Sequence, residues 1–182
     1  AKSPDAPSHV ANTHPEWVKK FNNWEWLDPG EPQAAQHTLN VILDVVHRYD
    51  IDGVHLDDYF YPYKDYLKGA DFPDDVSWKR YQDAGGKLSR DDWRRDNVNR
   101  MIHDIYAEIK AVKPHVKFGI SPFGIARPKT PETVKSTFDQ YNTLYADAQL
   151  WLNEGWCDYW TPQLYWKIDS DQPYVDLLRW WI

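Results

Sequence analysis

One stretch decides the fold of this chain, residues 52–62, which reads Asp52-Gly53-Val54-His55-Leu56-Asp57-Asp58-Tyr59-Phe60-Tyr61-Pro62. Its first half alternates, with apolar Val54 and Leu56 on one side and His55 and Asp57 on the other, which is typical of a β-strand. Paired carboxylates and a run of aromatic residues follow directly. Functional groups of α/β folds gather at the carboxyl ends of inner strands, so this stretch predicts a strand that ends in an active site.

Two later segments repeat this logic, Val116 to Ser121 and Asp158 to Tyr165. When the same parity is applied to each strand, polar groups collect on one side and apolar groups on the other. The predicted inward set is His55, Asp57, Ser121, Thr161, Gln163 and Tyr165, and the outward set is Val54, Leu56, Phe118, Ile120, Pro162 and Leu164. The pattern predicts parallel strands around a polar mouth, with helices covering the apolar side.

Helical periodicity separates the predicted strands. The clearest segment begins at Glu31, carries Pro32 in its first turn and ends before Asp50. Ser89 opens another long helix with the spacing of a capping box, and Pro114 stops it. Shorter helices are predicted at 16–21, 76–84, 143–154 and 173–182, and loops at 1–14, at 22–30 with its two tryptophans, and at 63–74.

Composition limits the classes of function. A chain of 182 residues is expected to form a single domain, residues 1–182. Its net charge is −7 and its basic residues are scattered, which argues against nucleic acid as a partner. The single Cys157 excludes an internal disulfide framework, and no apolar run approaches the ~20 residues of a membrane helix. Most of the eleven Trp and twelve Tyr are expected in the core, and a few near strand ends are expected to stack on sugar rings.

Three ordered motifs resemble the bacterial glycoside-hydrolase-like family ten. They are DGVHLDDYFYP at 52–62, FGISPFGI at 118–125 and YWTPQLYW at 159–166, and the similarity runs from about Pro15 onward. The resemblance implies a (β/α)8 TIM-barrel catalytic domain that acts on glycan chains, in some members on peptidoglycan, and an extracytoplasmic location. A full barrel takes about 250 residues, so we expect a central segment with about three parallel strands and further strands before Ala1 and after Ile182.

Glycoside hydrolysis usually needs two carboxyl groups, and Asp57 is the first candidate. The run Asp52-Gly53-x-x-x-Asp57 also resembles the fourth-strand pattern of alpha-amylase-like and alpha-galactosidase-like enzymes, and this resemblance implies that Asp57 is the nucleophile. Asp58 is either its partner or a group that orients it, and a solvated turn is the alternative for both. Glu154 precedes its strand and so lies at the wrong end, which places the second acid in strands outside this chain.

The remaining candidates would bind the substrate. Polar groups for sugar hydroxyls and aromatic rings for stacking are both present near the strand ends, with plain packing as the alternative for each. The hydrogen-bonding candidates are His55, Ser121, Gln163 and Tyr165, and the stacking candidates are Tyr59, Tyr61 and Trp166. Arg127 could hold a substrate carboxylate such as that of a muramic acid residue, or it is a surface arginine.

No cofactor or metal is expected. The sequence has no Gly-rich phosphate loop, CxxC or HExxH motif, and the acidic segments 71–75 and 169–171 lack the ligand spacing of a calcium loop. The leading prediction is therefore a glycoside hydrolase domain, and the oligomeric state stays open. The alternatives are a non-catalytic barrel segment that binds glycan by aromatic stacking, and an unrelated α/β binding domain.

Overall fold

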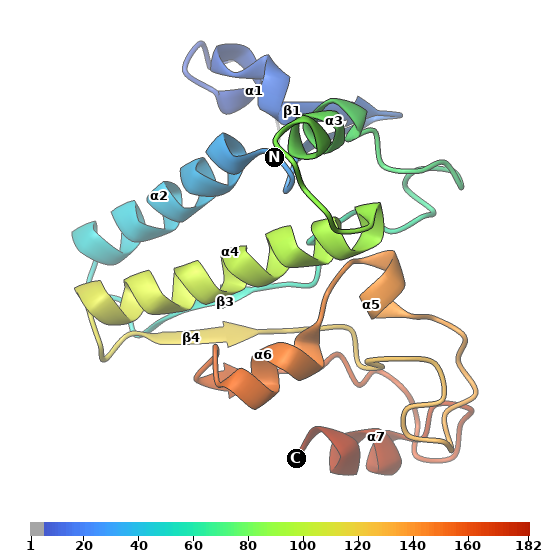
Figure 1. The fold of residues 1–182 in the computed structure, drawn as a ribbon. Helices are drawn as coiled ribbons and strands as arrows, with labels where there is room; N and C mark the ends of the chain where they lie inside the picture. The colour runs from blue at the N-terminus through green and yellow to red at the C-terminus, as the bar shows by residue number, and fades with distance from the viewer. Residues whose placement is uncertain (1–5) are drawn as a thin grey trace.

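The computed structural model describes residues 6–182 as a mixed α/β unit with two separate sheets (Figure 1). An antiparallel hairpin precedes a three-stranded parallel sheet whose strands follow in the order β3-β4-β5. The elements are α1 (Val10–Thr13), the 3-10 helix η1 (Pro15–Trp17), β1 (Val18–Phe21), β2 (Trp24–Leu27), α2 (Pro32–Arg48), β3 (Gly53–Leu56), α3 (Asp75–Asp83), α4 (Arg90–Val112), β4 (Lys117–Ile120), α5 (Gln140–Thr143), α6 (Ala148–Glu154), β5 (Tyr159–Trp160) and α7 (Tyr174–Trp181).

The parallel sheet confirms the three predicted strands and their common direction. His55 pairs with Gly119 in the register between β3 and β4, and Gly119 pairs with Tyr159 of β5. The third strand is shorter than predicted, because Pro162 has no backbone N–H to continue the ladder. Pairing resumes as one isolated parallel bridge between Phe123 and Gln163, so the alternation of side chains survives the gap.

Helices α2 and α4 cover the apolar side of this sheet. They pack against each other, and the buried residues of α4 join Phe118 and Ile120 of β4 in the main core. Figure 1 shows α4 running along β3 and β4. The Ser89 hydroxyl accepts a hydrogen bond from the Asp92 amide at 3.1 Å, as the capping-box spacing predicts. The core thus holds the three strand ends at one edge, where the predicted site lies.

The N-terminal hairpin corrects two predictions. Residues 16–21 were predicted as helix and 22–30 as loop, but β1 and β2 pair antiparallel, with Phe21 opposite Trp24. The Asn22-Asn23 loop makes this possible, because Asn22 adopts the left-handed φ of 50° that a tight hairpin turn requires. Phe21 and Trp26 then pack against the main core, which tethers the hairpin to the sheet.

Smaller differences concern loops and helix limits. Of the predicted helix 143–154, residues 148–154 form α6, whereas residues 144–147 are not helical and the short helix α5 ends at Thr143. Gly155 ends α6 in the expected left-handed conformation, with φ of 67°. Of the segment 1–14, predicted as loop, residues 10–13 form the short helix α1, and residues 1–5 lie outside the described part of the chain. The predicted loop 63–74 contains neither helix nor strand, in agreement with the sequence.

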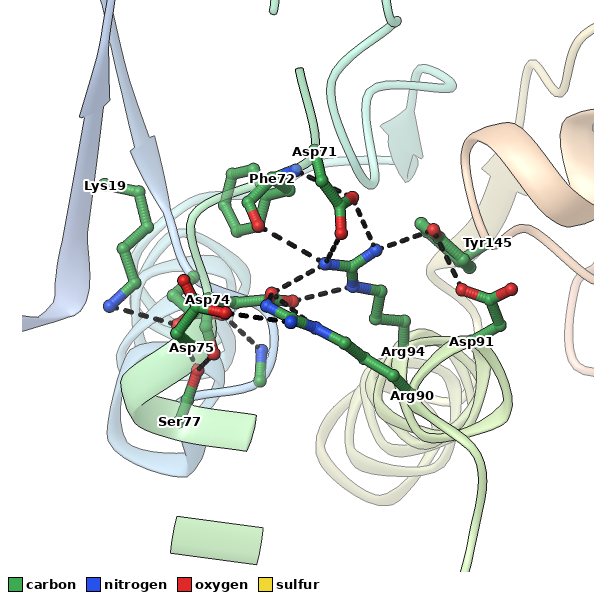
Figure 2. A network of polar contacts seen from close by, with 12 residues as sticks. Lys19, Asp71, Phe72, Asp74, Asp75, Ser77, Arg90, Asp91, Arg94 and Tyr145 are labelled. Carbon is green, nitrogen blue, oxygen red and sulfur yellow. Dashed lines mark hydrogen bonds and ion pairs between the residues drawn. The ribbon is translucent and has the colours of Figure 1, made fainter. Parts of the chain in front are cut away.

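That connection is nevertheless held firmly, by the polar network of Figure 2. Arg94 of α4 has 1% of its side chain exposed and donates to both carboxylate oxygens of the fully buried Asp74, at 2.7 and 2.6 Å. Arg94 also donates to Asp71 at 2.9 Å and to the Tyr145 hydroxyl at 2.7 Å, and Arg90 pairs with Asp74. The acidic segment 71–75 therefore neutralises two arginines, and it fastens the connection after β3 to α4.

Candidate functional site

Asp57 follows β3 at the carboxyl edge of the sheet, and its side chain is exposed on the predicted polar side. Gln163 Nε2 donates to Asp57 Oδ1 at 2.9 Å and also to the Ser121 carbonyl at 3.0 Å. The Asp58 amide donates to the same Oδ1 at 2.8 Å. Both hydrogen bonds reach the same oxygen, Oδ1. The structure thus joins the ends of all three strands at this carboxylate.

A second polar layer lies one step down the strands from Asp57. The His55 ring contacts the Ser121 hydroxyl through Nε2 at 2.6 Å and the Tyr159 hydroxyl through Nδ1 at 3.0 Å. Gly119 is required between them, because a Cβ there would lie 2.2 Å from the Tyr159 ring. His55 and Ser121 therefore support the site from beneath, and Ser121 also links this layer to Gln163 through its carbonyl.

Asp58 follows Asp57 beyond the end of β3 and differs from it in its surroundings. It is buried, and it accepts a hydrogen bond from the Tyr63 hydroxyl. Burial raises the pKa of the Asp58 carboxyl, and burial together with the same hydrogen bond raises the pKa of Tyr63. Asp58 is therefore placed to anchor the turn after β3 rather than to touch a ligand, which favours the orienting role over that of a second catalytic group.

Aromatic rings surround the carboxylate on two sides. On one side Tyr59 faces Trp26, with ring centroids 6.4 Å apart, and the side chain of Tyr59 is 49% exposed. On the other side Tyr63 leads to Trp166 through a chain of contacts, Tyr63 to Phe138 at 5.7 Å, Phe138 to Phe123 at 4.3 Å and Phe123 to Trp166 at 5.7 Å. Tyr59 has an exposed ring at the site, as predicted, whereas Trp166 is half-buried at the end of a packed row.

A hollow of about 420 Å³ opens beside Asp57. Its rim carries Asp57, Tyr59, Trp26 and Glu25, and its inner part lies between α2, α4 and Leu56 of β3. Of the described strands only β4 pairs with β3, so this inner part lies along the unpaired edge of β3. The rim is where a ligand would meet the carboxylate.

Other predicted site residues lie elsewhere. Tyr61 was predicted to stack on a sugar, and this is wrong, because its side chain is 1% exposed and packs edge-on against Phe72 and Tyr145. Arg127 faces Asp139 at 3.3 Å, so its guanidinium already has a carboxylate partner within the chain. Tyr165 is 83% exposed and makes no described contact with Asp57.

The structure adds residues that the sequence analysis missed. Glu25 and Trp26 reach the rim of the hollow from the hairpin, and Tyr159 completes the layer under Asp57. Strand parity alone would have found Tyr159, two residues before the predicted inward Thr161. The one sequence signal for the hairpin is the Asn22-Asn23 pair, which suits a tight turn. Glu25 pairs with Lys20 at 2.8 Å, which lowers its pKa and keeps it ionised.

Within residues 6–182 no group of three or more His, Cys, Asp or Glu side chains could hold a metal ion. The carboxylates of Asp71, Asp74 and Asp75 pair with Arg90 and Arg94. A membrane span is also missing from this part of the chain, since none of its helices combines the necessary length and apolar character. The side chains at the site supply carboxylate, amide, imidazole and aromatic groups.

Comparison with known proteins places this site in a family. The family model described as Glycosyl hydrolase-like 10 matches residues 2–182. The chain belongs to the glycosyl hydrolase-like 10 family. It is 45% identical over 179 residues to the glycosyl hydrolase YngK of Bacillus subtilis (strain 168), and 34% identical over 179 residues to the glycosyl hydrolase DigH of Escherichia coli (strain K12).

These relatives are considerably longer. The aligned region covers 95% of this chain but 34% of YngK, and 96% of this chain but 40% of DigH. The family match confirms the resemblance drawn from the three motifs. The matched residues include Asp57, Gln163 and the aromatic residues near them. The chain is thus a glycosyl hydrolase-like segment that spans a little over a third of these relatives.

Proposed function

We propose that this glycosyl hydrolase-like 10 chain is part of the catalytic domain of a glycoside hydrolase, with Asp57 as its catalytic carboxylate. The observation that carries the proposal is the convergence of Gln163 and the Asp58 amide on one oxygen of an exposed carboxylate at the sheet edge. Two donors on Oδ1 restrict the orientation of the carboxylate, which lines the same hollow as Tyr59. Such preorganisation serves a group that must meet an anomeric carbon in line.

In the proposed reaction Asp57 acts as the nucleophile. Its Oδ2 forms a bond to the anomeric carbon while the bond from that carbon to the glycosidic oxygen breaks, and a second acid gives the leaving oxygen its proton. Water then attacks the anomeric carbon, its proton returns to the second acid, and the bond from that carbon to Asp57 breaks to restore the free carboxylate. Hydrogen bonds from Gln163 and the Asp58 amide stabilise the carboxylate before attack and after release.

The second acid is proposed to come from the part of the full-length protein outside this chain. Within the hollow, the exposed Glu25 pairs with Lys20, which lowers the pKa of Glu25, whereas a general acid is favoured by a raised pKa. The unpaired edges of β3 and β5 also fit an incomplete (β/α)8 barrel, to which neighbouring strands would add on both sides. We therefore infer a TIM barrel of which residues 1–182 form a central segment.

The substrate is proposed to be a bacterial glycan such as peptidoglycan, which implies an extracytoplasmic location. Exposed aromatic rings beside a carboxylate suit pyranose rings, whose apolar faces stack on aromatic surfaces. The competing proposal is a domain that binds glycan through these rings without cleaving it. The observation that favours this alternative is the lack of a second suitable carboxylate at the Asp57 rim among the described residues.

Replacing Asp57 separates the two proposals. In the full-length protein Asp57→Asn keeps the shape and the acceptor oxygen for Gln163 but removes the nucleophile, so hydrolysis should fall by at least about 10³-fold. Asp83→Asn, at an exposed carboxylate of α3, is the matched control and should leave activity unchanged. Release of reducing ends from peptidoglycan and other polysaccharides measures hydrolysis, and co-sedimentation with the same polymers measures binding.

Loss of hydrolysis with retained binding in Asp57→Asn supports the hydrolase. Binding by the wild type without release of reducing ends from any polymer supports the non-catalytic alternative. Full activity in Asp57→Asn would remove Asp57 from the mechanism.

A further inference from the structure

The hairpin carries an exposed tryptophan that neither the strand motifs nor the proposed chemistry uses. Trp24 lies at the start of β2, and 45% of its side chain is exposed. One face of its indole is stacked on Tyr66 of the connection after β3, with centroids 4.7 Å apart and planes within 22°. Tyr66 in turn lies almost parallel to Tyr59, with centroids 6.4 Å apart and planes within 8°. Three rings therefore lead from the catalytic rim to the hairpin tip.

This row of rings is held in place by backbone anchors. Asn22 Nδ2 donates to the Tyr66 carbonyl at 2.6 Å, which fastens the hairpin tip to the connection. Trp26 Nε1 donates to the Phe60 carbonyl at 3.3 Å, which fastens the hairpin to the segment after β3. A hydrogen bond between the phenols of Tyr59 and Tyr66 raises the pKa of Tyr59 to about 12. The rings are thus oriented before any ligand arrives, so little side-chain freedom would be lost on binding.

The row is also continuous with the space beside Asp57. Glu25 and Trp26 line both the hollow that contains Asp57 and a second hollow of about 640 Å³, which contains Trp24, Asn22 and Asn23. Asn23, Glu25 and Lys20 are exposed and line this second hollow together with Trp24, and Lys20 pairs with Glu25 at 2.8 Å. An aromatic face bordered by such polar groups suits a sugar ring, which needs an apolar surface for one face and hydrogen-bonding partners for its hydroxyls.

We propose that Trp24, supported by Tyr66, is a sugar-binding subsite that holds a pyranose of the same glycan chain beyond the residue bound at Asp57. The inference rests on the proposed function for the identity of the ligand, a polysaccharide chain. In this proposal the hairpin makes affinity depend on the length of the glycan. Chains long enough to reach Trp24 bind more tightly than chains that reach only the Asp57 rim.

Substitutions at Trp24 test this subsite in the full-length protein carrying Asp57→Asn, so that polymers stay intact. Trp24→Leu keeps an apolar side chain but removes the ring face, and Trp24→Tyr keeps a ring. Tyr49→Leu removes an exposed aromatic ring from the end of α2 and serves as the matched control. Binding is measured by co-sedimentation with peptidoglycan sacculi, chitin and cellulose, in about 0.5 M salt to suppress charge attraction. Thermal unfolding confirms that each variant is folded.

The proposal predicts that Trp24→Leu weakens binding to the retained polymer about tenfold, that Trp24→Tyr restores most of it, and that Tyr49→Leu equals the parent. Equal binding by Trp24→Leu and the parent overturns the subsite, and so does failure of the parent to bind any of the three polymers. The result is separable from the proposed function. If binding depends on Trp24 but the wild type releases no reducing ends, the subsite stands and the hydrolase proposal fails.

Discussion

Replacing Arg94 with methionine should destabilise the protein strongly. Arg94 is buried in α4 and makes two hydrogen bonds to Asp74, whose side chain is fully buried. Arg94→Met preserves much of the side-chain length but leaves Asp74 with Arg90 as its remaining guanidinium partner. Removing one member of a buried ion pair typically costs about 3–5 kcal/mol, because the other charge stays buried without full compensation. The free energy of unfolding should fall by about that amount.

Replacing Arg94 also removes the contacts that anchor the connection after β3. Arg94 donates to Asp71 at 2.9 Å and to the Phe72 carbonyl at 3.3 Å, so its loss frees the segment that carries Tyr63 and Tyr66 (Figure 2). Arg94→Lys should recover little of the stability, since a single ammonium group cannot make the paired hydrogen bonds of a guanidinium. Glycan binding through the rings of this segment should weaken in both variants.

Chemical denaturation of the full-length protein, followed by near-UV circular dichroism, measures the effect. Arg100→Met is the matched control on the same helix, because Arg100 pairs with Asp96 at 3.1 Å in solvent, with 61% of its side chain exposed. Surface pairs of this kind contribute about 0–1 kcal/mol. Equal effects of Arg94→Met and Arg100→Met would refute the structural role of the buried pair. Adding Asp74→Asn to Arg94→Met should recover part of the loss, because the uncompensated charge is then removed.

Other substitutions test the site itself. Gln163→Leu should lower kcat/KM for polysaccharide hydrolysis about 10- to 100-fold through loss of the 2.9 Å hydrogen bond to Asp57, whereas Thr161→Val should not; equal rates in both would contradict the positioning role. Burial raises the pKa of Asp58, so its share of stability is present below the ordinary carboxyl pKa and is lost as pH rises through the raised one. As the pH rises from about 4 to 7, the free energy of unfolding of Asp58→Asn should therefore increase relative to that of the wild type. A difference between the two proteins that does not change with pH would refute this. Gly119→Ala should displace Tyr159 from His55 and lower stability by about 1 kcal/mol, with no further loss on adding Tyr159→Phe; additive losses would show that the displacement does not occur.

The sheet and the catalytic edge could be predicted from sequence because strand parity is a local property. Val54 and Leu56 alternate with His55 and Asp57, and the same alternation two strands away brings Gln163 to Asp57, 106 positions apart in sequence. Three short parallel strands in sequential order leave few other arrangements. The polar face and the parallel directions therefore followed from the pattern of residue types.

Other features depend on contacts between distant segments that the pattern does not reveal. Tyr61 and Tyr59 belong to one aromatic run, yet the former is buried against Phe72 and Tyr145 while the latter is exposed. Asp71 and Asp74 look like a solvated acidic stretch until Arg94 is placed beside them. The hairpin was missed for a different reason, because the two lysines of β1 weaken its alternation and hide the strand.

The separation of carboxyl groups across the active site tests the account most directly. A structure of the complete catalytic domain would give the distance from Asp57 to the nearest facing carboxyl group other than that of Asp58. A retaining hydrolase with Asp57 as nucleophile predicts about 5–5.5 Å, and about 6.5–9.5 Å would instead make Asp57 the base of an inverting enzyme. If no other carboxyl group lies within about 10 Å of Asp57, cleavage of glycosidic bonds by this pair is contradicted.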